Sequence, residues 1–195
     1  RHRLGFDRGS ILLADAEGEH LDFAGGYGFG PEYDATLRKV RFNLKKSASQ
    51  GIFVRSFWDL KPLIVDDIDQ LKQHFSNRSQ ALLKTVKAQS LICVPIIYEK
   101  VPLGIIAVDN HASRRKLTQS DLNLMMGLAS QLAVGINNAE SFQKLQRSEE
   151  RYRDIFENVS DFLYYHDLEG RIIETNRSFQ RVSGYAPREL HRKSI

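Results

Sequence analysis

The amino-acid sequence predicts an α+β protein that consists of a first domain, a long helix and an incomplete second α/β segment. Three observations predict this class. Paired runs of β-branched and aromatic residues occur before residue 110, apolar residues recur at helical spacing from residue 117 onward, and another pair of strand-like runs follows residue 160. With 195 residues, of which 42% are hydrophobic, the chain has room for one domain of ordinary size and part of another.

Two hairpins are predicted in the first domain. The apolar stretches 11–14 and 21–24 flank the polar turn Glu17-Gly18-Glu19, which predicts two antiparallel strands joined by a short turn. The segment SLICVPIIYEKVPLGIIAVDN contains two β-branched runs that meet at Glu99-Lys100, which is typical of a tight hairpin.

The segment between these hairpins alternates between helix and strand signals. In SASQGIFVRSFWD, the spacing of Ile52, Phe53 and Phe57 predicts a short helix that ends before the Lys61-Pro62 step. PLIVDDI then reads as a buried strand, and the more polar residues 68–87 read as helical.

A long amphipathic helix is predicted from residue 117 to about residue 158. Thr118 is a suitable N-cap, and Asp121 follows it at the spacing of a capping box. Two consecutive steps of three around Phe142 shift the phase of the apolar stripe, which predicts two helix registers of similar energy. A narrow apolar stripe needs a partner, and we expect a second copy of the chain. The predicted stripe comprises Leu122, Met125, Ala129, Leu132, Ile136, Ala139, Phe142, Leu145, Tyr152 and Phe156.

The last residues predict the beginning of a second domain. FLYYHDLEGRIIETN reads as a hairpin that turns at Glu169-Gly170, and RSFQRVSGYAPREL reads as a short helix that stops at Gly184 and restarts after Pro187. Two short strands and two helical turns bury too little surface to stand alone, so we expect this domain to be incomplete and the chain to be a piece of a longer protein.

Residues 1–142 resemble a GAF domain that lacks its first helix. The resemblance is carried by LGFDRGSILL, SQGIFVRSFWDLKPLIVDDI and LICVPIIYEKVPLGIIAVDN, which occur in the order of that family's strands and helices. It implies a central antiparallel sheet flanked by helices, with a pocket for a small ligand. The pocket residues that the family's geometry implies are Tyr27, Phe29, Phe53, Phe57, Asp66 and Phe75.

Residues 158–195 resemble the N-terminal part of a PAS domain, and residues 143–157 would form the connecting helix. The motif positions are Asp167, Gly170, Asn176, Gly184, Tyr185, Pro187 and Glu189. A GAF domain joined to a PAS domain is similar to the sensory half of bacterial sensor histidine kinases. The resemblance implies a cytoplasmic homodimer that binds an unknown small ligand or partner and relays the signal to a downstream kinase. The alternative is a ligand-free dimerisation or spacer module of a diguanylate cyclase or a transcriptional regulator.

Catalytic and cofactor chemistry find little support in the sequence. Cys93 is the single cysteine and lies inside an apolar run, so we expect it to pack in the core. The reactive cysteine of flavin-binding PAS domains would fall near Ile195, whereas a haem ligand such as His74 stays open. We therefore expect no catalytic centre, no metal site and no assigned cofactor. The modest charge of +4 and the absence of a long apolar run predict neither nucleic-acid binding nor a membrane span within these residues.

Overall fold

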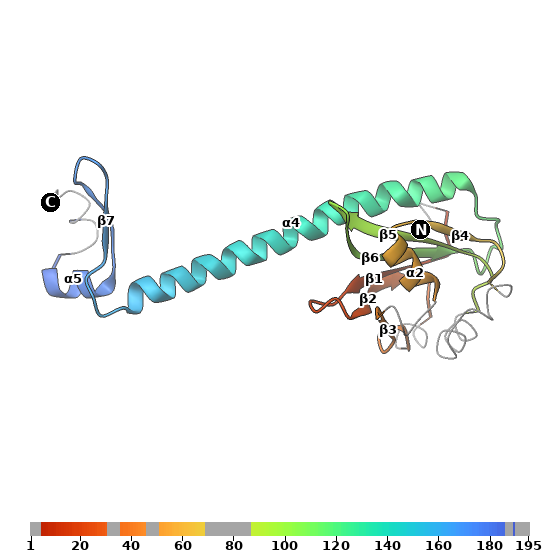
Figure 1. Ribbon diagram of the computed structural model, residues 1–195, viewed down its shortest axis with the longest axis horizontal. Helices are drawn as coiled ribbons and strands as arrows, with labels where there is room; N and C mark the ends of the chain where they lie inside the picture. Colours follow the sequence, from red (N-terminus) through yellow and green to blue (C-terminus); the bar gives the residue numbers. More distant parts are fainter. Residues whose placement is uncertain (1–4, 31–35, 46–50, 69–86, 186–188, 190–195) are drawn as a thin grey trace. The chain divides into compact units, whose positions relative to one another are not determined.

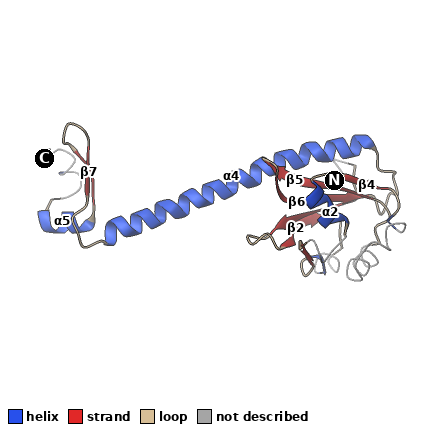
Figure 2. Ribbon diagram, viewed as in Figure 1, coloured by secondary structure: helices blue, strands red, loops and turns tan. Residues whose placement is uncertain are grey.

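The computed structural model describes residues 5–30, 36–45, 51–68, 87–185 and 189. The chain divides into two compact units, Arg1–Asn137 (unit 1) and Asn138–Ile195 (unit 2). The helix α4 (Gln119–Asn158) begins in unit 1 and ends in unit 2. Figure 1 shows the elements in chain order and Figure 2 their secondary structure.

Unit 1 contains a six-stranded antiparallel sheet with the order β3-β2-β1-β6-β5-β4. Its strands are β1 (Arg8–Ala14), β2 (His20–Tyr27), β3 (Arg41–Asn43), β4 (Leu63–Val65), β5 (Leu91–Tyr98) and β6 (Val101–Asp109). The short helix α2 (Ile52–Asp59) lies on one face of this sheet, and the first part of α4 lies on the other (Figure 1). This architecture confirms the predicted α+β class and its central antiparallel sheet.

Both faces of the central strands are buried, which explains their continuous apolar sequences. Successive side chains of a strand point to opposite faces, so Cys93 of β5 packs toward α2 whereas Ile92 packs toward α4. The same division holds in β6, where Ile105 and Ile106 belong to opposite cores. Unit 1 therefore has two hydrophobic cores that share one sheet.

The predicted turns and helix ends of unit 1 are confirmed. Tyr98 pairs with Val101, and the intervening Glu99 and Lys100 have φ values of 46° and 70°, as a two-residue primed turn requires. The β1–β2 hairpin turns through Gly18, which has a φ of 66°. Helix α2 ends at Leu60, whose φ is 54°, before the Lys61-Pro62 step.

One strand differs from its prediction. The sequence Leu63–Val65 suggests a buried strand, but only Val65 is buried, and Ile64 is 38% exposed. The reason is position, because β4 pairs with β5 alone and forms an edge of the described sheet. The helical segment predicted at 68–87 lies almost entirely outside the described residues.

The capping box at the start of α4 is confirmed. The Thr118 hydroxyl accepts a hydrogen bond from the Asp121 backbone N–H at 3.3 Å, and the Asp121 carboxylate accepts one from the Thr118 backbone N–H at 2.8 Å. Arg115 donates to both carboxylate oxygens of Asp121, at 2.9 and 3.0 Å. Hydrogen bonding from Arg115 and Thr118 lowers the pKa of Asp121 to about 2.

The described residues of unit 2 contain the end of α4, a two-stranded hairpin and the short helix α5. The elements are β7 (Tyr164–His166), β8 (Ile172–Thr175) and α5 (Arg177–Ser183). The hairpin turns at Gly170 with a φ of 81°, and α5 ends at Gly184 with a φ of 73°, as predicted. The predicted restart after Pro187 lies outside the described residues.

Asn176 holds the parts of unit 2 together through its fully buried side chain. Its Oδ1 accepts hydrogen bonds from the backbone N–H groups of Leu163 and Phe179, at 3.1 and 3.0 Å. Its Nδ2 donates to the carbonyl oxygens of Val159 and Asp161, at 3.3 and 2.8 Å. One amide therefore caps α5 and fixes the segment that follows α4.

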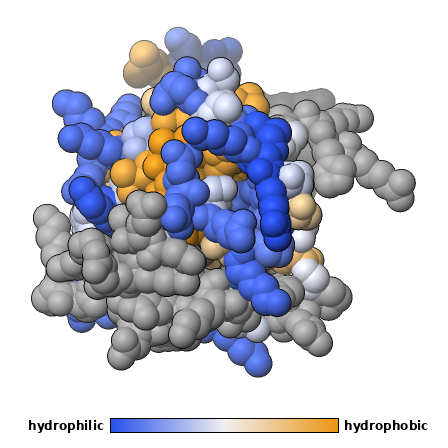
Figure 3. All heavy atoms as spheres, turned by 90° about the vertical axis from the view of Figure 1, so that its right-hand side faces the viewer, coloured by the Kyte–Doolittle hydropathy of each residue, from blue (hydrophilic) through white to orange (hydrophobic). Residues whose placement is uncertain are grey.

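The surface is mixed in character. Figure 3 shows a group of apolar residues set among hydrophilic side chains on the face that it views. Among the described residues, no helix combines the length and apolar content that crossing a bilayer requires.

Candidate functional site

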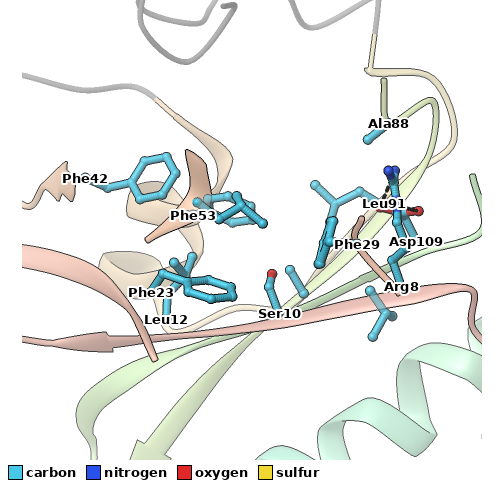
Figure 4. Close-up of a pocket in the computed structure, with 13 residues that line it drawn as sticks. Arg8, Ser10, Leu12, Phe23, Phe29, Phe42, Phe53, Ala88, Leu91 and Asp109 are labelled. Carbon is cyan, nitrogen blue, oxygen red and sulfur yellow. Dashed lines mark hydrogen bonds and ion pairs between the residues drawn. The ribbon is translucent and has the colours of Figure 1, made fainter. Parts of the chain in front are cut away.

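A small cavity lies in unit 1, on the face of the sheet that also carries α2. Its volume is about 60 Å³, and strands β1 and β6 form its floor (Figure 4). Because Arg8, Ser10 and Leu12 alternate along β1, all three side chains face this side of the sheet. The remaining lining residues are Phe23, Phe29, Leu37, Phe42, Phe53, Ala88, Leu91, Ala107, Val108 and Asp109.

Most of the lining is apolar, and aromatic rings provide much of it. Phe42 and Phe53 meet edge to face with ring centroids 5.2 Å apart, which brings β3 and α2 together at one side of the cavity. Phe23 lies next to them, and Phe29 lies on the opposite side with Leu91 (Figure 4). Such a lining favours contact with apolar groups.

A buried ion pair supplies the charged part of the lining. Arg8 of β1 and Asp109 of β6 are direct cross-strand partners. The Arg8 Nε lies 2.8 Å from Asp109 Oδ1, and the Arg8 Nη2 lies 2.8 Å from Oδ2. Their side chains are 7% and 8% exposed. An ion pair this deeply buried must offset the desolvation of both groups, and the Arg8 Nε contributes by donating to both carboxylate oxygens, at 2.8 and 3.1 Å.

Arg8 also stacks on an aromatic ring. Its guanidinium carbon lies 5.2 Å from the centroid of Phe29. Gly28 positions Phe29, because its φ of 78° suits glycine and a Cβ there would clash with the carbonyl oxygen of Asp7. Arg8 and Phe29 also contribute to a second, wider cavity of about 430 Å³, whose other lining residues are Asp7, Gly28, Gly30, His111 and Ala112.

The structure brings together two of the six predicted pocket residues, Phe29 and Phe53. Tyr27 is 47% exposed and its ring lies over Gly9, on the face of β1 opposite to Arg8 and Ser10. Burial and the charges of Asp109 and Asp7 raise the pKa of Tyr27.

The other three predicted pocket residues have different places. Phe57 is buried in the hydrophobic core beneath α2. Asp66 is exposed at the end of β4, and Phe75 lies outside the described residues. Helical spacing predicts that the apolar residues of this short helix face the protein interior. It does not distinguish Phe53, which borders the cavity, from Phe57, which fills the core.

Sequence reasoning missed the ion pair and most of the lining. Arg8 and Asp109 are 101 positions apart in the chain, so only the pairing of β1 with β6 brings them together. The sequence does show an arginine and an aspartate at the ends of two apolar strands. A charged residue at a strand end is ordinarily expected to be solvated, so these two residues did not suggest a buried pair.

The predicted stripe of α4 has two different surroundings. Leu122, Met125 and Ala129 are buried against the sheet of unit 1, and Leu132 and Ile136 pack beside them. These five residues therefore face the core of their own chain, which corrects their assignment to a surface between two copies. Ala139, Phe142 and Leu145 are exposed, and the last two are each 68% exposed.

The end of the stripe packs within unit 2. Phe156 is 4% exposed and stacks between Tyr152 and Tyr165, with centroid distances of 5.6 and 5.8 Å. Tyr152 stays 44% exposed. Its contacts with Tyr165 and Glu174 raise its pKa to about 12. Phe156 is therefore also excluded from a surface between copies.

Cys93 packs in the core, as predicted. It is fully buried, and desolvation raises the pKa of its thiol to about 12. Among the described residues, no group of three or more histidine, cysteine or carboxylate side chains converges as metal ligands would.

Comparison with known proteins agrees with this architecture. The GAF domain model matches residues 1–136. The chain belongs to the GAF domain family. A PAS domain model matches residues 150–195. The chain is therefore a GAF–PAS sensory module of the kind found in signalling proteins. No curated protein sequence matches it.

Solved structures of GAF domains and signalling proteins resemble this GAF domain. A methyl-accepting chemotaxis protein shares 26% identity at a TM-score of 0.58, covering 70% of this chain and 82% of that one. A domain of a putative two-component sensor histidine kinase from Sinorhizobium meliloti 1021 shares 20% identity at a TM-score of 0.55, covering 73% and 86%. The GAF domain of an Acinetobacter phosphoenolpyruvate-protein phosphotransferase shares 18% at 0.56, covering 72% and 77%.

Proposed function

We propose that this chain is the sensory and relay module of a two-component sensor histidine kinase, which binds a small ligand in the cavity of unit 1 and acts without chemistry of its own. The ligand class that suits the cavity is a small, flat and largely apolar molecule with one polar group. Its apolar part would contact Phe23, Phe42 and Phe53, and its polar group would reach Ser10 or the Arg8–Asp109 pair.

The observation that carries the proposal is the double role of β6. Ala107, Val108 and Asp109 line the cavity, and Ile106 and Val108 belong to the core that includes Met125 of α4. One stretch of β6 therefore contributes both to the cavity and to the core on which the helix packs. A ligand that displaces Asp109 would shift the surface on which α4 packs, because close-packed cores transmit small displacements.

The similar structures support the signalling context. One neighbour comes from a sensor histidine kinase and another from a chemotaxis protein. The choice of a histidine kinase as the parent, the homodimer through α4 and a cytoplasmic location are parts of the proposal. A ligand-free spacer module is the competing function.

Native mass spectrometry of the purified protein tests ligand binding. We expect a small molecule to co-purify or to be taken up from a panel of small aromatic metabolites. Ser10→Leu places an apolar side chain in the cavity and should abolish the added mass, whereas Ser160→Leu, an exposed position in unit 2, should retain it.

Hydrogen exchange then tests the relay. Ligand should change the protection of α4 amides in unit 1, where Met125 packs on the β6 core. If no molecule binds, or if Ser10→Leu binds as well as the parent chain, the spacer function replaces the sensory one.

A further inference from the structure

The cavity proposed for the ligand, which we call the small cavity, does not hold a whole aromatic molecule. Its volume is about 60 Å³. A cavity that binds benzene has a volume of about 150 Å³, and pockets for small-molecule ligands span about 300–1,000 Å³. A ligand of the proposed class therefore needs additional space beside this cavity.

The second cavity of unit 1, which we call the wide cavity, supplies this space with its volume of about 430 Å³. Among the described residues, Arg8 and Phe29 line both cavities. These two side chains also contact each other, since the Arg8 guanidinium carbon lies 5.2 Å from the centroid of the Phe29 ring. Figure 4 shows the Phe29 ring beside Arg8, across the small cavity from Phe53. The stacked pair of Arg8 and Phe29 is therefore the partition between the two cavities.

Phe29 is the member of this pair that can rotate away. Arg8 belongs to β1, and its Nε donates to both carboxylate oxygens of Asp109, at 2.8 and 3.1 Å. Phe29 instead follows the end of β2, is half-buried, and lies between Gly28 and Gly30, which have no side chains to obstruct its ring. Rotation of the Phe29 side chain would therefore join the two cavities without disturbing the pairing of β1 with β6.

We infer that the ligand occupies both cavities, with an aromatic ring that replaces the Phe29 ring on the Arg8 guanidinium and a polar head group in the wide cavity. The exchange preserves the cation–π contact of Arg8, because one aromatic ring takes the place of another. This inference rests on the proposed function for the existence of a ligand. It adds the position of the head group, and it makes Phe29 the residue that controls access.

The charges near the wide cavity favour a head group that donates hydrogen bonds. Asp7 lines this cavity, and the positive charge of Arg8 is opposed by its ion pair with Asp109. Burial raises the pKa of Tyr27, and the charges of Asp109 and Asp7 raise it further, so these carboxylates disfavour an additional anion at this end of the sheet. The ligand class is therefore an aromatic alcohol or amine, and an aromatic acid is disfavoured.

Substitution of Phe29 tests the partition, with 4-fluorobenzyl alcohol as the probe and ¹⁹F NMR titration of the full chain as the measurement. Phe29→Ala removes the ring that the probe must displace, so it should bind the probe about tenfold more tightly than the parent chain. Phe29→Trp fills more of the passage and should bind the probe about tenfold more weakly. Phe142→Ala, the same truncation at an exposed position of unit 2, should leave the affinity unchanged.

The methyl signals of two alanines test whether the probe spans both cavities. Ala107 lines the small cavity and Ala112 lines the wide cavity. Both methyl signals of the parent chain should shift as the probe is added. The methyl signal of Ala16, in the turn between β1 and β2, is the control and should stay in place.

Two results would overturn the inference. One is equal or weaker binding of the probe to Phe29→Ala, as expected if Phe29 were an ordinary wall of the site. The other is a shift of Ala107 alone or of Ala112 alone. Weaker binding to Phe29→Ala together with a shift of Ala107 alone would leave the proposed function intact. A shift of both methyl signals without any change in the exchange of α4 amides would support the joined site and remove the relay.

A comparison of head groups tests the ligand class. 4-Fluorobenzyl alcohol and 4-fluorobenzylamine should each bind at least about tenfold more tightly than 4-fluorobenzoate. Asp7→Asn keeps an acceptor oxygen for the backbone N–H groups of Ala112 and Ser113, and it should reduce this preference to about threefold. Asp154→Asn, at an exposed position of unit 2, should retain the full preference. Tighter binding of 4-fluorobenzoate than of the other two probes would overturn the assignment of the head group.

Discussion

The two parts of α4 share one secondary structure but bury different amounts of surface. In unit 1, Leu122, Met125, Ala129 and Ala133 are buried against the sheet. In unit 2, Phe156 is the one buried residue of the helix. The first part is fixed by its own domain, whereas the second presents most of its circumference to solvent. A continuous helical pattern in the sequence therefore predicts the extent of a helix. It does not predict which residues pack against each turn of that helix.

The largest expected effect comes from Met125→Ala. Met125 is 1% exposed and its neighbour Met126 is 43% exposed, so the two methionines form a matched pair. We expect Met125→Ala to lower the free energy of unfolding of unit 1 by about 3 kcal/mol, since truncation leaves a cavity in the core. Urea unfolding followed by the fluorescence of Trp58, the single tryptophan, measures it.

Met126→Ala is the control and should change the stability by less than about 0.5 kcal/mol. Similar losses in the two variants would mean that α4 does not pack on the sheet through the Met125 face. The contrast between buried and exposed sides of the helix would then fail in unit 1.

The next effect concerns the other end of α4. Asn176→Ala removes four hydrogen bonds and leaves partly buried backbone groups without this partner, which should cost about 2 kcal/mol. Hydrogen exchange of the Leu163 and Phe179 amides should accelerate accordingly. Asn158→Ala, which removes an exposed bond to the Asp154 carbonyl, should leave both amides unchanged. Unaltered exchange in Asn176→Ala would show that this amide does not hold the segment after α4.

The smallest effect concerns the start of α4. Asp121→Asn removes a capping carboxylate and should cost about 1 kcal/mol at neutral pH. Because the folded pKa of Asp121, about 2, lies below the ordinary value, its contribution is present above pH 4 and is lost as the pH falls toward 2.

Urea unfolding between pH 2 and pH 5 measures this contribution. The parent chain should lose stability on acidification more steeply than Asp121→Asn. Asp154→Asn, at an exposed position of α4 in unit 2, should keep the parent's slope. Parallel curves for the parent and Asp121→Asn would contradict the role of the Arg115 and Thr118 contacts.

Local signals in the sequence predicted much of the fold. The tight turn at Glu99-Lys100, the capping pair Thr118 and Asp121, and the helix stop at Gly184 each depend on neighbours within a few residues. Such features are encoded by backbone preferences and short-range hydrogen bonds. These turns and caps therefore form wherever the adjoining strand or helix forms.

The candidate site was much less predictable. Phe29 and Phe53 were expected to border a pocket, but the Arg8–Asp109 pair and Ser10 were not. Their meeting depends on the register of β1 against β6, and a slip of one residue would turn Arg8 and Ser10 to the opposite face. Phe57 was expected to border the pocket but fills the core, although it belongs to the same helix as Phe53.

The sequence by itself determined the three hairpins, their turns, the approximate bounds of the long helix and the families to which the two domains belong. Only the tertiary structure decided which face of α4 packs on its own sheet, and thereby which residues of the helix remain exposed. The physical reason is that the amphipathic periodicity of a helix indicates that one face is buried, but it does not identify the surface that buries this face. Leu122 and Phe156 obey the same helical rule, yet one meets β-sheet residues and the other meets two tyrosines.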